Sequence, residues 1–185
     1  MNFDIKEIDI KFDYSEYRNY YNNICENYSH LMFTNKLIKD TVESDKHNVS
    51  KVYGFGLQSN LQDLTVPCPP WNVHKDGSDE YRDTELVFGP ILKLKELFPN
   101  SRQYSISGHP PGTMIQQHTD TDKYLKIHLP ILTNPDACFV FGDKKYCLKV
   151  GKAYLINTTR LHGTINSGNT DRVHLFFKVP AEDYL

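Results

Sequence analysis

Short β-rich segments separated by turn residues fill the carboxy-terminal part of the chain, and this alternation restricts the possible folds more than any other feature. Eight such segments follow Ser101 within about 80 residues: QYSIS, TMIQQH, YLKIHLPIL, CFVFG, KYCLKV, KAYLIN, HGTIN and RVHLFFKV. Turn residues separate them, as in HPPGT, TNPD, FGDK and NSGNTD. Many short strands at regular spacing are typical of a jelly-roll or another small double-sheet barrel. We therefore expect a β-barrel core over residues 101–180.

The first 100 residues differ in pattern and predict a helical and loop-rich support region. Apolar residues recur there at spacings of three and four, which indicates one helix that packs its aromatic stripe on a sheet: Tyr14, Tyr17, Tyr21, Ile24, Tyr28 and Leu31. Asp13 and Glu16 resemble a capping box at its start. A second, shorter helix is expected over 37–42, a strand over 51–57, a proline-rich loop over 66–72 and a third helix over 90–98. The prediction is a single domain, 1–185, with these helices packed outside the barrel.

Charge and hydropathy exclude several classes of protein. The 185 residues include 21 basic and 23 acidic side chains, a net charge of -2, without a block of like charge. A broad nucleic-acid-binding face is therefore not expected. No apolar run approaches the roughly 18 residues that would span a bilayer, and the first residues lack the pattern of a signal peptide, so we expect a soluble cytoplasmic protein.

The four cysteines, Cys25, Cys68, Cys138 and Cys147, lack zinc-finger spacing, and we expect reduced thiols. One alternative stays open. A two-residue turn at Gly142-Asp143 would place Cys138 opposite Cys147, where a disulfide could form.

Two His-x-Asp triplets occur, and only one has suitable partners downstream. In a strand, residues i and i+2 point to the same side, so His118 and Asp120 can face one site. His162 follows the apolar segment KAYLIN and could supply a third ligand, and Arg172 opens the next strand. Two imidazoles and one carboxylate suit ferrous iron, and a guanidinium suits a dicarboxylic cosubstrate. The other triplet, 74–76, has no such companions, and we interpret it as a solvated loop or substrate rim.

The sequences YSISGHPPGTMIQQHTDTDKYLKIHLPIL and GKAYLINTTRLHGTINSGNTDRVHLFFKV together resemble the aspartyl/asparaginyl β-hydroxylase family of Fe(II)- and 2-oxoglutarate-dependent oxygenases. The likeness covers roughly the last 80 residues. It includes the order Pro-Gly-Thr, His-Thr, basic-x-His-Leu, His with Asn four residues later, and Arg ten residues later. The resemblance implies a double-stranded β-helix (jelly-roll, cupin-like) core, mainly β with flanking helices. It also implies hydroxylation of an unactivated C–H bond, with O2 and 2-oxoglutarate consumed and succinate and CO2 released.

The resemblance also implies roles for individual residues. His118 and His162 would be iron ligands, and Arg172 would bind the distal carboxylate of 2-oxoglutarate. Asp120 would complete the ligand set, because some members of the family lack this carboxylate and this sequence has it. Lys126, His128 and Ser105 match positions that contact the cosubstrate in the family. The family has an arginine where this chain has Lys126, so the contact made there would come from a point charge instead of a planar fork.

The substrate would be an aspartyl, asparaginyl or other side chain in a protein or peptide, or a free amino acid. Trp71, His174 and Asn60 are the candidates for substrate contact. The other histidines, His30, His47 and His109, are expected to be structural or solvated, and Asp122 is expected in a turn.

Two other functions remain open. A cupin-type metal-dependent isomerase or dioxygenase is one, because Gly151 to His162 and Asn166 loosely match the second cupin motif, although the first cupin motif requires His-x-His. The other is a non-catalytic metal-binding barrel, because a fold does not guarantee activity.

Overall fold

The computed structural model describes residues 3–10, 12–34, 51–70, 80–120 and 123–184. Several predicted features therefore lie outside the described residues: the helix over 37–42, the 74–76 triplet, His47, Trp71 and Asp122. The helices are α1 (Tyr14–Asn27) and α4 (Pro90–Leu97), with short 3-10 turns η1 (Ser29–Leu31) and η2 (Ala181–Tyr184). The strands are β1 (Ile5–Ile8), β2 (Met32–Phe33), β3 (Tyr53–Gly56), β4 (Gln58–Ser59), β5 (Arg82–Asp83), β6 (Arg102–His109), β7 (Thr113–His118), β8 (Tyr124–Leu132), β9 (Ala137–Phe141), β10 (Lys144–Tyr146), β11 (Ala153–Ile156), β12 (His162–Asn166) and β13 (Arg172–Pro180).

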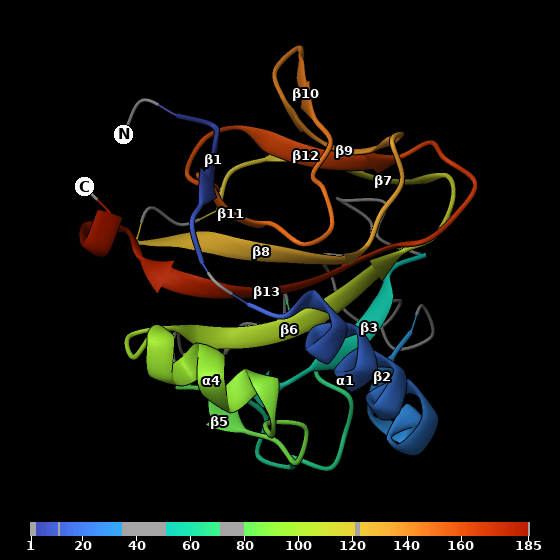
Figure 1. Cartoon of the computed structure of the whole chain (residues 1–185), viewed down its shortest axis with the longest axis vertical. Coiled ribbons are helices and arrows are strands. Elements are labelled where there is room, and N and C mark those ends of the chain that lie inside the picture. The colour runs from blue at the N-terminus through green and yellow to red at the C-terminus, as the bar shows by residue number, and fades with distance from the viewer. Residues whose placement is uncertain (1–2, 11, 35–50, 71–79, 121–122, 185) are drawn as a thin grey trace.

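Two antiparallel sheets form a jelly-roll, the double-stranded β-helix that the sequence predicts. The larger sheet has seven strands in the order β1-β11-β8-β13-β6-β3-β2, and the smaller has four in the order β10-β9-β12-β7. Figure 1 shows the smaller sheet over one face of the larger sheet and the two helices on the opposite face. β13, the last strand of the chain, lies in the middle of the larger sheet between β8 and β6.

All eight predicted strands of the carboxy-terminal part are present, although the one predicted in KYCLKV ends at Tyr146. The amino-terminal region does more than support the barrel from outside, because it adds β1, β2 and β3 to the larger sheet. β1 pairs with β11 along Ile5 to Ile8. The sequence IKEI gives no strict alternation of apolar and polar residues, which is why the pattern did not indicate this strand.

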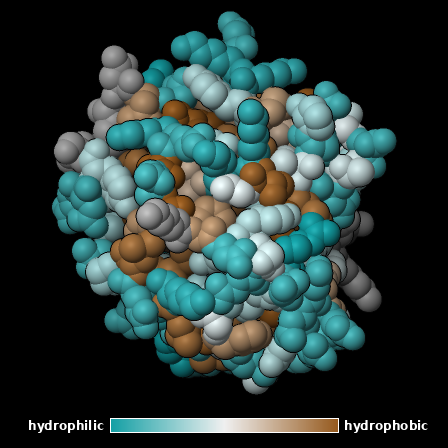
Figure 2. Space-filling model, in the orientation of Figure 1, coloured by the Kyte–Doolittle hydropathy of each residue, from teal (hydrophilic) through white to brown (hydrophobic). Residues whose placement is uncertain are grey.

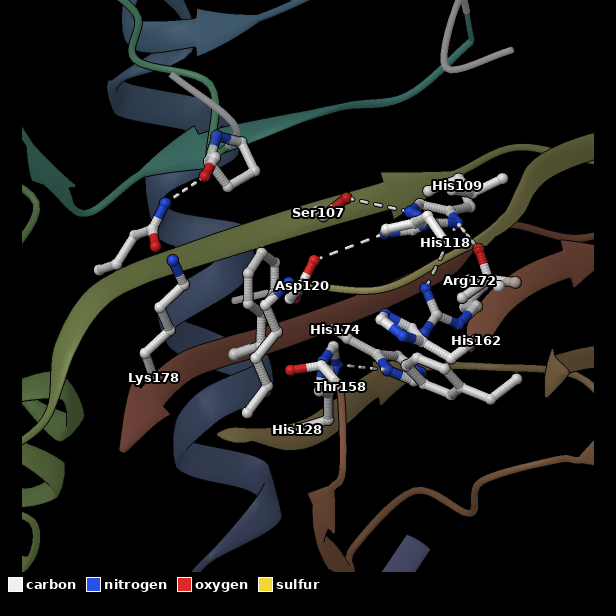
Figure 3. Close-up of a pocket in the computed structure, with 18 of the residues that line it drawn as sticks. Ser107, His109, His118, Asp120, His128, Thr158, His162, Arg172, His174 and Lys178 are labelled. Carbon is white, nitrogen blue, oxygen red and sulfur yellow. Dashed lines mark hydrogen bonds and ion pairs between the residues drawn. The ribbon is translucent and has the colours of Figure 1, made fainter. Parts of the chain in front are cut away.

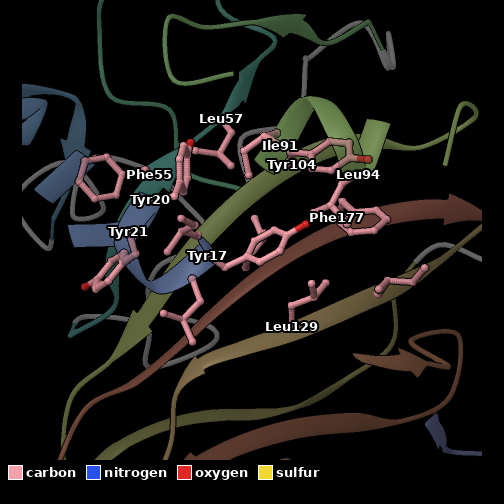
Figure 4. Close-up of a cluster of buried hydrophobic side chains, with 14 of the residues drawn as sticks. Tyr17, Tyr20, Tyr21, Phe55, Leu57, Ile91, Leu94, Tyr104, Leu129 and Phe177 are labelled. Carbon is pink, nitrogen blue, oxygen red and sulfur yellow. The ribbon is translucent and has the colours of Figure 1, made fainter. Parts of the chain in front are cut away.

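The two helices cover the outer face of the larger sheet and build the main core there. Asp13 is the N-cap of α1, and its carboxylate accepts a hydrogen bond from the Ser15 amide. α4 begins at Pro90, as predicted. Aromatic and aliphatic side chains from both helices and the sheet pack together in Figure 4, among them Tyr17, Tyr20, Tyr21, Ile91, Leu94, Tyr104 and Phe177. The predicted aromatic stripe is therefore core.

The hairpin of β9 and β10 turns at Gly142-Asp143, because Phe141 pairs with Lys144. Cys138 and Cys147 form a disulfide next to this hairpin. The expectation that all four cysteines are reduced is wrong for this pair, and the alternative based on the hairpin turn is confirmed. Cys25 and Cys68 are free thiols.

The surface carries both hydrophobic and hydrophilic side chains. Figure 2 shows hydrophobic residues across the middle of one face among largely hydrophilic ones. Within the described part of the chain, no helix combines the length and apolar character needed to cross a membrane.

Candidate functional site

A cavity of about 420 Å³ opens between the two sheets (Figure 3). β13 supplies one wall with four alternate residues, Arg172, His174, Phe176 and Lys178. Successive residues of a strand point to opposite faces, so these four face the cavity while Val173, Leu175 and Phe177 face the helices. One strand therefore builds both the site and the core.

Three candidate metal ligands converge in this cavity. His118 ends β7, His162 begins β12, and the two residues lie opposite each other in the pairing of these strands. Asp120 follows two residues after His118, and its amide donates to the Thr158 carbonyl at 2.8 Å. The ligand atoms of His118, Asp120 and His162 all lie within 4.8 Å of one another. The structure thus brings together the three residues that the sequence singled out.

Backbone carbonyls orient both histidine rings. His118 Nδ1 lies 2.8 Å from the Gln116 carbonyl, and His162 Nδ1 lies 2.9 Å from the Arg160 carbonyl. A carbonyl oxygen can only accept, so each Nδ1 carries the proton and each Nε2 keeps its lone pair for a ligand. A fixed second partner of this kind is typical of metal-binding histidines. The sequence could not identify these partners because they are main-chain atoms.

The charges of the site suit a divalent cation. Burial lowers the pKa of His162 to about 4, so its imidazole is neutral near pH 7. Burial alone would raise the pKa of Asp120, but the nearby Lys126 ammonium outweighs it and holds this pKa below its usual range. A neutral imidazole and an ionised carboxylate are the forms that bind metal, and the set of two imidazoles and one carboxylate fits ferrous iron.

Lys126 lines the cavity, and its ammonium contacts Asp120, one of the three candidate metal ligands. Its ammonium lies 2.7 Å from Asp120 Oδ2, while Asp120 Oδ1 lies 3.6 Å from His118 Nε2. One carboxylate oxygen thus faces the histidine and the other faces the lysine. The predicted contact between Lys126 and the cosubstrate stays a prediction.

Arg172 forms a cationic end of the cavity. The side chain is 2 % exposed, and its guanidinium carbon lies 4.9 Å from the centre of the Phe139 ring. Burial lowers its pKa to about 9, which leaves it charged near pH 7. Nε and Nη2 are buried without a hydrogen-bond partner among the described residues. A buried cation with unused donors suits an anionic ligand, because leaving such a charge unpaired is costly.

Three buried histidines surround Arg172. His109 Nδ1 lies 3.4 Å from Arg172 Nη1, and His128 Nδ1 lies 3.4 Å from His174 Nδ1. Burial lowers the pKa of all three well below the usual value, and the charge of Arg172 lowers each further. They are therefore neutral polar groups. His109, which was expected to be structural or solvated, lines the cavity, as do His128 and His174.

Two other predicted residues do not line the cavity. Ser105 is buried on the same side of β6, but Ser107 is the serine that lines the cavity, and its hydroxyl lies 3.1 Å from His109 Nε2. Asn60 is buried outside the cavity, with its amide oxygen 3.7 Å from Cys68 Sγ. Gln103 and Lys178 also line the cavity and were not predicted, although alternation from Ser105 and from His174 could have indicated them.

The comparisons with known proteins point to one family. The family described as aspartyl/asparaginyl beta-hydroxylase matches residues 85–181, just over half of the chain. No curated protein matches the sequence.

A solved structure of low sequence identity shares the fold, and two others match with lower TM-scores. A Pseudomonas putida prolyl-4-hydroxylase is 8% identical with a TM-score of 0.56, covering 97% of this chain and 93% of that one. A viral collagen prolyl hydroxylase from Paramecium bursaria Chlorella virus-1, solved with 2OG, is 10% identical with a TM-score of 0.49, covering 97% and 96%. A predicted oxalate decarboxylase from Thermotoga maritima is 23% identical with a TM-score of 0.38, covering 46% and 73%.

Proposed function

Because the chain belongs to the aspartyl/asparaginyl β-hydroxylase family, we propose that it is an Fe(II)- and 2-oxoglutarate-dependent oxygenase that hydroxylates an unactivated C–H bond. One observation carries the proposal: a single cavity contains the convergent ligand atoms of His118, Asp120 and His162 and the buried guanidinium of Arg172, whose Nε and Nη2 have no hydrogen-bond partner among the described residues. The first set suits a metal and the second an organic anion. We propose that the whole chain, 1–185, forms one oxygenase domain around this cavity.

In this proposal His118, Asp120 and His162 hold ferrous iron. The backbone carbonyls at Gln116 and Arg160 hold Nδ1 of the two imidazoles, which leaves each Nε2 available as the atom that would bind the ion. When bound, iron and 2-oxoglutarate supply the O2-activating chemistry, and succinate and CO2 are released. The chain itself orients these groups and keeps water away from the buried end of the cavity.

Arg172 would bind the distal carboxylate of 2-oxoglutarate through Nε and Nη2, which have no hydrogen-bond partner in the described part of the chain. The neutral His128 ring, stacked 5.0 Å from the Phe176 ring, presents a polar edge to the same cosubstrate. Ser107 takes the place of Ser105 in this proposal, because Ser107 lines the cavity. Lys126 stays a candidate contact as well as the partner of Asp120.

The substrate in this proposal is an aspartyl, asparaginyl or other side chain of a protein or peptide, or a free amino acid. His174 lines the cavity, and its buried Nε2 has no hydrogen-bond partner among the residues that the structure describes, so it stays a candidate contact. Asn60 is no longer one, because it lies outside the cavity.

Turnover of the cosubstrate tests the proposed reaction. Anaerobic protein is mixed with ferrous iron and 2-oxoglutarate, exposed to O2 with and without a peptide panel, and assayed for succinate. We expect succinate from the unmodified protein and none above background from His162→Ala, which lacks one metal ligand. Equal amounts from both proteins across the whole panel would contradict the oxygenase assignment.

Cosubstrate affinity tests the role of Arg172. We expect Arg172→Ala to weaken 2-oxoglutarate binding by about 1.5 to 3 kcal/mol, roughly 10- to 150-fold, because a charged pairing is lost. Calorimetry with Mn²⁺ in place of iron measures this without turnover. Arg102→Ala is the matched control, since Arg102 pairs with Lys178 near the other end of β13 and is not among the residues that line the cavity. Unchanged affinity in folded Arg172→Ala would remove the assignment.

A further inference from the structure

The segment 157–160, which follows β11, contacts two of the three candidate metal ligands through its main chain. The Thr158 carbonyl accepts from the Asp120 amide at 2.8 Å. The Arg160 carbonyl lies 2.9 Å from His162 Nδ1 and holds that ring. A displacement of this one segment would therefore disturb two candidate ligands together.

The amino-terminal end of the described chain holds this segment in place. β1 pairs with β11, so the residues just before β1 lie beside the residues just after β11 (Figure 1). The Asn157 amide donates to the Asp4 carbonyl at 2.9 Å, and the Asn157 side chain donates to the Phe3 carbonyl at 3.1 Å. Within the segment, the Arg160 amide donates to the Asn157 carbonyl at 3.3 Å. The position of Asp4 is thus transmitted along the segment to Arg160.

The Asp4 carboxylate adds a second connection to the same segment. Its Oδ1 forms an ion pair with Arg160 Nη1 at 3.0 Å, and its Oδ2 accepts from the Tyr146 hydroxyl at 2.7 Å. An ion pair between two exposed side chains contributes little, but the Asp4 side chain is only 7 % exposed. A buried carboxylate is costly unless it is paired, which favours one fixed arrangement. The ion pair therefore restrains the residue whose carbonyl holds His162.

We infer that Asp4 is a positioning residue of the candidate metal centre and acts through the segment 157–160. It keeps the Arg160 carbonyl where that carbonyl fixes the His162 ring. A ring fixed in advance binds metal more tightly, because less freedom is lost on binding. Asp4 itself is not among the residues that line the cavity. This inference rests on the proposed function, in which His162 is an iron ligand.

The tautomer of His162 tests the connection in the metal-free protein. Nitrogen-15 NMR of histidine-labelled protein distinguishes a ring protonated at Nδ1 from one protonated at Nε2. We expect Nδ1 to carry the proton of His162 in the unmodified protein and both tautomers to be populated in Asp4→Ala, because the Arg160 carbonyl is no longer held. The His118 ring is the internal control and should not change, since the Gln116 carbonyl holds it from β7.

Metal affinity tests the consequence for the site. We expect Asp4→Ala to weaken Mn²⁺ binding by about tenfold, the lower end of the range for losing a group that orients a ligand. Arg160→Met keeps the carbonyl but breaks the ion pair, so it should have a similar effect, and the double variant should bind no more weakly than either. Glu7→Ala is the matched control, because it removes a carboxylate of β1 that pairs with Lys152 at 2.8 Å on the surface.

The ion-pair variants also separate positioning from a simple effect of charge. If Asp4 acted only through its negative charge, removing the positive charge of Arg160 would strengthen Mn²⁺ binding. Weaker binding in both variants therefore supports positioning, and stronger binding in Arg160→Met overturns it. Where Asp4→Ala does not fold, Asp4→Asn decides: it keeps an acceptor for Tyr146, and we expect a smaller change in the same direction.

Loss of stability is controlled separately. Leu94→Ala destabilises the core on the far face of the larger sheet and should leave the His162 tautomer and the Mn²⁺ affinity unchanged. An unchanged tautomer and affinity in folded Asp4→Ala would overturn the positioning role while the unmodified protein still binds Mn²⁺. An equal change at His118 would overturn it as well, because the effect would not pass through Arg160. Failure of the unmodified protein to bind Mn²⁺ argues instead against the proposed function.

Discussion

Lys126 and Asp120 form an ion pair inside the candidate metal centre, so a metal ion bound there would share this carboxylate with the lysine. Both side chains are about one-fifth exposed, and their atoms lie 2.7 Å apart. Without metal, the lysine compensates a carboxylate that burial would otherwise disfavour. With metal, the same ammonium repels the incoming cation. A sequence shows that a lysine replaces an arginine here, but not which group the lysine contacts.

Lys126→Met should therefore have two opposite effects. The metal-free protein should lose about 1 to 3 kcal/mol of unfolding free energy, less than for a fully buried pair because solvent screens part of the charge. Affinity for Mn²⁺ should rise by about tenfold or more, because two like charges a few ångströms apart repel strongly at an effective dielectric constant near 20. Urea denaturation and calorimetry measure the two effects, and Lys126→Arg should show neither. Unchanged Mn²⁺ affinity with weaker 2-oxoglutarate binding would make Lys126 a cosubstrate contact instead.

The sequence also does not show which serine of β6 lines the cavity. Ser105 and Ser107 both face the cavity side of the strand, so alternation cannot tell which of them lies at the accessible depth. The ligand triad was predictable because its spacing within two segments follows from strand geometry.

At the scale of elements, the hairpin of β9 and β10 forms part of the cavity wall and carries a covalent cross-link. Phe139 of β9 packs under the guanidinium of Arg172, and its neighbour Cys138 is bonded to Cys147. The hairpin turn left this disulfide open as an alternative, whereas reduced thiols were expected. The sequence pattern indicated which two cysteines lie opposite each other, but not whether they are oxidised.

Removing this cross-link should lower the unfolding free energy. We expect Cys138→Ser combined with Cys147→Ser to lose about 2 to 3 kcal/mol, because a disulfide that closes a short loop restricts the unfolded chain. Guanidinium denaturation measures the loss. A reducing agent should destabilise the unmodified protein by a similar amount and leave the double variant unchanged. A further loss in the reduced double variant would assign the effect to another group.

At the scale of the whole molecule, the seven-stranded sheet separates the main core from the site. The helices pack on one face, and the cavity lies on the other, between the sheets. Strand pattern and helix periodicity predicted this arrangement for the carboxy-terminal strands and for α1 and α4. β1 was not predicted, because only its pairing with β11 in the folded sheet makes IKEI a strand.

Because the core and the cavity lie on opposite faces of the sheet, a mutation in the core should lower stability without changing cosubstrate affinity. Leu94→Ala in α4 should lower stability by about 2 to 5 kcal/mol, since Leu94 is buried in the core. Affinity for 2-oxoglutarate, measured well below the melting temperature, should stay within about twofold. Leu92→Ala, at a 47 % exposed position of the same helix, should change stability by less than about 0.5 kcal/mol. Loss of cosubstrate affinity in folded Leu94→Ala would show that the two faces are coupled.

The central place of β13 also bears on how the chain folds during synthesis. The ribosome makes β6 and β8 before β13, and these two strands do not pair with each other but are joined in the sheet only through β13, which lies between them. Most contacts of the larger sheet are thus distant in sequence, a topology that slows folding. The nascent barrel must remain incomplete, with strand edges open to aggregation, until Arg172 to Pro180 have left the ribosome.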